Sequence, residues 1–183
     1  MDDDPLQSVY SYVERAYVRL QAGDLLTRCL EENSILPVQQ LVDGLVLAGP
    51  SSLQAMREIL AEASQRKSQV QDDLHQLYKE LEKSLRSYGV ELKKGIDLPA
   101  VARILPSQVL GVLEDQSALS DESRPTCVQI LEDGRDLADN LLIKLNLLAE
   151  IESYLQDWLW GIAYQSVRLR GPSSQLPGEL LSQ

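Results

Sequence analysis

Residues 51–88, SSLQAMREILAEASQRKSQVQDDLHQLYKELEKSLRSY, decide the fold class, because their apolar residues recur at alternating steps of three and four. This spacing places the apolar residues on one side of an α-helix for about five heptads. Ser51 with Gln54 is typical of a helix start, and Gly89 is typical of a left-handed helix end. The pattern predicts one helix of about 38 residues, roughly 57 Å long. Its apolar side is formed by Leu53, Met56, Leu60, Ala63, Val70, Leu74, Leu77, Leu81 and Tyr88.

A second long helix is predicted from Arg124 and Pro125 to about Leu169. It carries two apolar stripes, and a helix with two stripes packs on more than one side. The first stripe is Cys127, Leu131, Gly134, Ala138, Leu141, Leu145, Leu148, Glu152, Leu155, Leu159 and Ile162, and the second is Ile130, Leu137, Leu142, Ile151 and Trp158.

Strand patterns are weak, since no Asn-Gly or Asp-Gly turn lies between runs of alternating apolar and polar residues. We therefore expect an all-α protein: an elongated helical bundle with two long antiparallel helices and short helices capping one end.

Two charged residues interrupt the apolar sides of the long helices. Lys67 and Glu152 each occupy a position where the heptad calls for an apolar side chain. A buried charge needs a partner, so we expect the two to pair across the antiparallel helices and to set their alignment. The alternative is that each charge reaches solvent from the edge of the interface.

The rest of the chain predicts shorter elements. A first helix opens at Pro5, breaks or bends near Gly23 and ends at Asn33, and a second runs from about Pro37 to Ala48. Residues 90–122 predict short helical pieces, with Asp97 as a cap, followed by a polar loop. We expect a single helical domain over residues 1–170 and a disordered tail over residues 171–183.

Composition excludes several classes of partner. The 183 residues carry 28 acidic and 17 basic side chains and a formal charge of −11, which opposes binding to nucleic acid or to an anionic membrane. The most apolar stretch, residues 137–164, is interrupted by five charged residues, so we expect no membrane insertion. The first residues resemble no signal peptide, and Cys29 and Cys127 have no metal-site or disulfide spacing. We expect an intracellular, cytoplasmic protein with two reduced thiols.

Catalytic patterns are weak as well. His75 is the only histidine, and Asp72 lies three residues before it, a spacing that holds a metal only together with a second such motif. No nucleophile elbow or glycine-rich phosphate loop occurs in the sequence. We therefore expect no catalytic, metal or cofactor-binding residues and no enzyme activity.

The sequence favours a non-catalytic protein–protein interaction module: a scaffold, adaptor or assembly subunit. The interface candidates are Trp160, Tyr164, Leu180 and Leu181. For Trp160 we expect burial within the fold, with an exposed interface anchor as the alternative. The partner is another protein or a second copy of the chain. Two alternatives remain: a regulator or assembly chaperone of an enzyme complex that meets a basic partner, and an enzyme or ligand carrier with an interhelical pocket.

Overall fold

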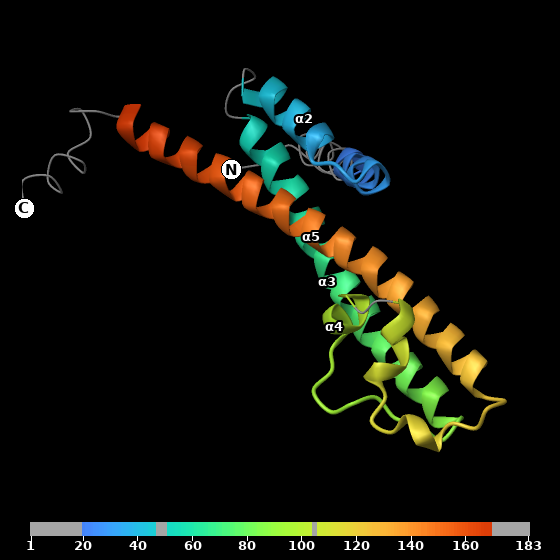
Figure 1. The fold of residues 1–183 in the computed structure, drawn as a ribbon. Coiled ribbons are helices and arrows are strands. Elements are labelled where there is room, and N and C mark those ends of the chain that lie inside the picture. Colours follow the sequence, from blue (N-terminus) through green and yellow to red (C-terminus); the bar gives the residue numbers. More distant parts are fainter. Residues whose placement is uncertain (1–19, 47–50, 104–105, 170–183) are drawn as a thin grey trace, which may run out of the picture. The chain divides into compact units, whose positions relative to one another are not determined.

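The computed structural model describes residues 20–46, 51–103 and 106–169, and these ranges form an all-α fold (Figure 1). A first helix covers residues 20–32 and is followed by α2 (Leu36–Val46) and the long α3 (Ser51–Arg86). The short α4 (Leu98–Arg103) and two 3₁₀ helices, η1 (Pro106–Val112) and η2 (Gln116–Ala118), precede the long α5 (Arg124–Leu169). The described ranges contain no strand, only an isolated antiparallel bridge between Leu92 and Leu113. The all-α prediction is confirmed.

The chain divides into two compact units, and both long helices contribute to each of them. Unit 1 consists of the residues up to Ser64 together with those from Leu147 onward, and unit 2 is Gln65–Asn146. The expected single domain over residues 1–170 stays a prediction, and the expected tail over residues 171–183 lies outside the described residues. No helix in the described ranges is long and apolar enough to cross a membrane.

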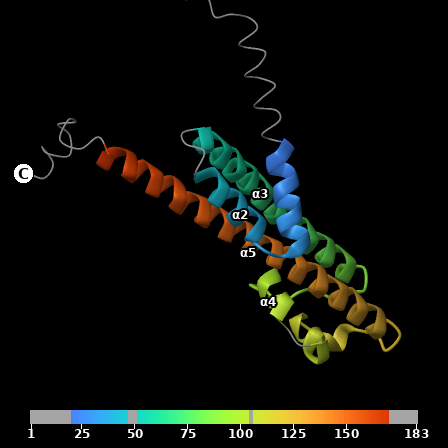
Figure 2. The ribbon, with the colours of Figure 1, turned by 90° about the horizontal axis from the view of Figure 1, so that it is seen from above.

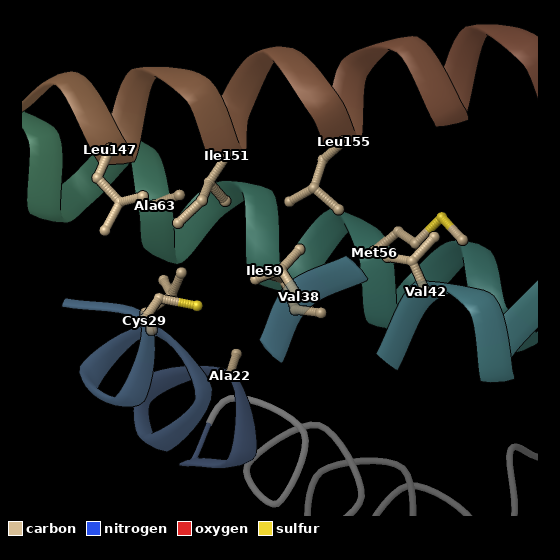
Figure 3. Close-up of a cluster of buried hydrophobic side chains, with 11 residues drawn as sticks. Ala22, Cys29, Val38, Val42, Met56, Ile59, Ala63, Leu147, Ile151 and Leu155 are labelled. Carbon is tan, nitrogen blue, oxygen red and sulfur yellow. The ribbon is translucent and has the colours of Figure 1, made fainter. Parts of the chain in front are cut away.

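Unit 1 packs the helix of residues 20–32 and α2 against the first part of α3 and the last part of α5 (Figure 2). Figure 3 shows side chains from all four helices pointing into one core. In this unit the two long helices run antiparallel, since Met56 and Ala63 of α3 share the core with Leu155 and Leu147 of α5. The buried members are Ala22, Leu26, Cys29, Val38, Val42, Met56, Ile59, Ala63, Leu147, Ile151 and Leu155.

Unit 2 packs the short helices against the end of α3 and the start of α5. Leu85 of α3 and Leu131 of α5 are fully buried beside residues from the connecting segment, among them Val101 and Val112. A second cluster joins Leu77 and Leu81 to Leu98 of α4 and Ala138 of α5. These contacts are also antiparallel, and they agree with the expectation that short helices cover one end of the long pair.

Two helix ends follow the chemistry that the sequence predicts. Gly89 has φ +76°. The Val90 N–H donates to the Leu85 carbonyl at 3.2 Å and the Gly89 N–H donates to the Arg86 carbonyl at 3.0 Å, which is the hydrogen-bond pair of a Schellman motif. Asn33 has φ +48° and closes the first helix, where Ser34 N–H donates to the Cys29 carbonyl at 3.0 Å. The first helix is not broken at Gly23.

Caps elsewhere are partly as expected. The Asp97 carboxylate accepts a 2.9 Å hydrogen bond from the Ala100 N–H, which confirms the predicted cap of α4. The predicted loop after Leu113 contains η2, capped by Asp115. At the start of α3, the Gln54 amide N–H donates to Glu58 at 3.0 Å along the helix. The expected cap with Ser51 stays a prediction, since the Ser51 side chain lies outside the described residues.

The apolar side of α3 differs from the heptad at several positions. Leu85 and Ile59 are buried although neither was expected there, whereas Tyr88 is 38% exposed. A straight α-helix drifts about 20° per heptad from a strict seven-residue repeat, which brings Leu85 rather than Tyr88 to the core. Leu20 of the first helix and Leu41 of α2 are also exposed, at 69% and 40%.

Two close approaches define the alignment of α3 and α5 within the units. In unit 1 the Ser64 hydroxyl donates a 2.6 Å hydrogen bond to the Glu152 carboxylate. In unit 2 Leu81 lies directly against Gly134. If Lys67 lay opposite Glu152, the two helices would be shifted along each other by about one helical turn relative to each of these contacts. The pairing itself would join residues of different units and stays a prediction.

The bond between Ser64 and Glu152 gives a direct test of the alignment in unit 1. We expect Ser64→Ala and Glu152→Gln to be coupled by about 0.5–1 kcal/mol in a double-mutant cycle, because a hydrogen bond to a partly exposed charge contributes modestly. Urea unfolding of the four proteins measures this coupling. Lys67→Met in the same series tests the pairing expected from sequence. Additive effects of Ser64→Ala and Glu152→Gln would show that the two side chains do not interact in solution.

Candidate interaction site

An apolar groove of about 300 Å³ lies in unit 1 between the first helix, α2 and α3. Each helix contributes residues about one turn apart along the side that faces the groove. The groove is open to solvent at Leu41, which is 40% exposed. It is lined by Gln21, Ala22, Asp24, Leu25 and Arg28 of the first helix, Leu41 and Leu45 of α2, and Ala55 and Ile59 of α3.

Local sequence explains why this apolar surface is left open. Val38 and Val42 turn one side of α2 into the core of unit 1, where both are fully buried. Leu41 and Leu45 lie on the adjoining side of α2, one turn apart, where Leu41 is exposed and Leu45 is half-buried. On the first helix, Ala22 and Leu26 enter the core while Leu25 stays half-buried at the groove.

The lining of the groove carries one acidic and one basic side chain, and the unit around it is acidic. Asp24 and Arg28 are exposed on its rim. Across the side chains of unit 1 that the structure describes, only Arg28 and Arg57 are basic. The acidic side chains in the same ranges are Asp24, Glu31, Glu32, Asp43, Glu58, Glu62, Glu150, Glu152 and Asp157. The groove is therefore an apolar surface within an acidic unit.

Of the interface candidates predicted from the sequence, the structure describes the side chain of Trp160. Trp160 is 77% exposed on α5, so the expectation that it is buried is wrong, and its role as an interface anchor stays a prediction. Trp158, two positions earlier on the opposite side of the helix, packs against the core of unit 1 as predicted. The side chain of Tyr164, and Leu180 and Leu181 altogether, lie outside the described residues.

A second hollow, of about 390 Å³, lies in unit 2 and is polar. Arg86 and Glu91 line it and approach each other to 3.8 Å, with both side chains 64% exposed. Asp115, also on its wall, has its pKa lowered by hydrogen bonds from the Ser117 hydroxyl and N–H. These groups are solvated and already engaged locally, so the hollow offers no convergent set of ligands.

The side chains that could bind a metal ion or act in catalysis do not lie close together either. His75 is exposed on α3, and no three His, Cys, Asp or Glu side chains in the described ranges come close enough to hold a metal ion. Cys29 and Cys127 are free thiols, buried in the cores of unit 1 and unit 2 respectively. Burial raises the pKa of both thiols, because it disfavours the charged thiolate.

The buried thiols predict how the protein responds to alkaline pH. Because the folded-state pKa values lie above the unfolded value of about 8.5, the thiols stabilise the fold below that pH and lose this contribution as pH rises through the folded values. We expect the unfolding free energy to fall above about pH 8.5, and thiol reagents to modify both cysteines far faster in denaturant. Cys29→Ala with Cys127→Ala should flatten the alkaline decline. An equally steep decline in that double variant would assign it to other groups.

The spacing of apolar residues did not predict the groove, because Leu41 and Leu45 belong to the same apolar run from which α2 itself is predicted. The sequence holds one indication of such a groove: a short helix with apolar residues on two adjoining sides, more than one core contact would bury. Comparisons of the chain with known protein families, with curated proteins and with solved structures found no match.

Proposed function

We propose that the protein is a non-catalytic interaction module, a scaffold, adaptor or assembly subunit that binds another protein through the groove of unit 1. The observation that carries this proposal is the open apolar groove itself, built from residues one turn apart on three helices. Grooves of this construction receive the apolar side of an amphipathic helix.

Further features support an interface. Trp160 is highly exposed on α5 of the same unit, and exposed tryptophans are frequent anchors of protein interfaces. A cytoplasmic location, with both thiols reduced, belongs to the same proposal. Whether the partner is a different protein or a second copy of the chain is decided by the experiment below.

A small-molecule carrier is the competing function that the same groove suggests. Ligand pockets generally range from about 300 to 1,000 Å³ and enclose most of the ligand. The groove lies at the lower limit of this range and is open at Leu41. Its polar lining residues, Gln21, Asp24 and Arg28, are all exposed, so the groove encloses no polar group that would hold a small ligand away from water. Both observations favour a protein partner.

The test is to purify the tagged full-length chain from cells of its source and to measure which proteins remain bound in stoichiometric amounts. The comparison variants are Leu41→Asp, which places a charge in the groove, and Leu137→Asp, which makes the same change at a 53% exposed leucine of unit 2. Circular dichroism confirms that both variants stay folded. A partner retained by the wild type and by Leu137→Asp, but lost from Leu41→Asp, supports the proposal. Light scattering of the purified material distinguishes a second copy from a different protein. Recovery of the chain alone and as a monomer under mild conditions contradicts the proposal.

A further inference from the structure

We infer that the groove of unit 1 accepts an amphipathic α-helix of another protein, with basic residues beside its apolar side. This inference rests on the proposed function and names the chemistry of the partner. It depends on two features of the described residues: the apolar floor of the groove and the acidic side chains along its flanks.

The floor sets the apolar positions of the partner. Leu25, Leu41 and Ile59 come from three different helices and face one open space of about 300 Å³. Such a space has room for a few large side chains, and a helix presents neighbouring side chains at three- and four-residue spacing on one side. The partner therefore carries large apolar residues at positions such as i, i+4 and i+7.

The flanks set the charge of the partner. Asp24 is on the rim, and Glu32 continues the side of the first helix on which Leu25 and Arg28 lie. On α3, Glu62 follows Ile59 by three residues and continues the side that lines the groove. Arg28 also lines the groove, so the attraction comes from the acidic excess around the groove and not from its lining. Lysine or arginine beside the apolar stripe of the partner would meet this excess, which favours association and its rate.

Charge also argues against other occupants. A second copy of the chain carries the same charge of −11, and its approach to an acidic unit is opposed by like charges. Nucleic acid and anionic membranes are opposed for the same reason. A basic helix is the occupant whose charge complements this surface.

The experiment uses the full-length chain and a matched pair of labelled helical peptides. Both peptides are about 18 residues long, or five turns, with leucine at i, i+4 and i+7. The basic peptide has lysine beside the leucines, and the acidic peptide has glutamate at the same positions. A scrambled basic peptide, with the leucines spread around the helix, controls for charge alone. Fluorescence anisotropy gives the dissociation constants at low and at physiological salt.

Four variants locate the site. Leu41→Asp and Asp24→Lys change the groove and its rim. Leu137→Asp is the control for the first, and Asp43→Lys is the control for the second, because exposed Asp43 lies on α2 but does not line the groove. We expect Leu41→Asp to weaken the basic peptide about tenfold or more and Asp24→Lys about threefold or more. The control variants should stay within about twofold of the wild type, since they leave the contact surface intact.

The outcomes are distinct. Tighter binding of the basic peptide than of both other peptides, with the expected loss in the two groove variants and a weakening by salt, supports the inference. Equal binding of the basic and scrambled peptides, or equal losses in groove and control variants, overturns it. If light scattering shows a dimer that Leu41→Asp converts to a monomer, a second copy occupies the groove and the inference is wrong. If a partner is purified with the chain but its binding is insensitive to both groove variants, this inference and the use of the groove fail, while an interaction function through another surface survives.

Discussion

Replacing Ile151 by alanine is expected to lower the free energy of unfolding by about 2–5 kcal/mol, the usual cost of truncating a large core side chain to alanine. Ile151 is fully buried in the core of unit 1, where side chains from all four helices of that unit meet. The cost has two parts: the lost burial of apolar surface and the cavity that the surrounding helices cannot fill. Leu131→Ala should have an effect of similar size in unit 2, since Leu131 is fully buried there.

Urea unfolding followed by circular dichroism measures both effects. Leu137→Ala is the control: this leucine is on α5 as well but is 53% exposed, and its replacement should change stability by about 0.5 kcal/mol or less. Losses below about 1 kcal/mol for both core variants would contradict the packing of α5 described above.

A side chain added at Gly134 is expected to bring no gain in stability, although glycine is unfavourable inside a helix. A Cβ atom at this position would lie 2.6 Å from Cδ2 and 2.9 Å from Cδ1 of Leu81, which is itself buried. Glycine in a helix ordinarily costs about 1 kcal/mol relative to alanine, whereas overpacking a core costs about 1–3 kcal/mol. We therefore expect Gly134→Ala to be neutral or destabilising, and Gly134→Leu to cost about 3 kcal/mol or more.

Gly161 supplies the matched control on the same helix. A Cβ atom there would meet nothing within 4 Å, so Gly161→Ala should stabilise the protein by about 0.5–1 kcal/mol. The contact with Leu81 is tested by repeating Gly134→Ala in the Leu81→Ala background, where the crowding is relieved and the change should become stabilising. Stabilisation by Gly134→Ala in the wild-type background would show that the helices are less closely packed at this point.

Much of the fold follows from the sequence, because helix ends and helix lengths depend on local chemistry. Gly89 and Asn33 end helices through their left-handed conformations, Asp97 caps α4, and α5 spans the predicted range. Each of these depends on a few neighbouring residues and is therefore visible in a short stretch of sequence.

The side of each helix that becomes buried was predicted less well, because it depends on the neighbours that the fold supplies. Leu85 replaced Tyr88 in the core since the helix drifts relative to a strict heptad. Ile151 and Leu137 belong to the same predicted stripe of α5, yet the first is buried in unit 1 and the second is exposed in unit 2. Periodicity reports that a stripe exists but not where along the helix it is covered.

The groove was not predicted from the sequence, because it also depends on the neighbours that the fold supplies. It arises where three consecutive helices leave space between Leu25, Leu41 and Ile59, and this space depends on how the helices pack against one another. Trp160 illustrates the same limit. The sequence shows that it belongs to neither apolar stripe of α5, but its exposure depends on which elements pack beside the helix.

The most direct test of the central claim is photocrosslinking from inside the groove of the full-length chain in its source cells. A photoreactive phenylalanine analogue replaces Leu41, and the same analogue at Leu137 is the control. We expect the Leu41 position to crosslink to another protein, at a segment that has apolar residues at helical spacing with lysine or arginine beside them. Crosslinks from Leu41 that lie only within this chain or its copies, or that match those from Leu137, would contradict the account.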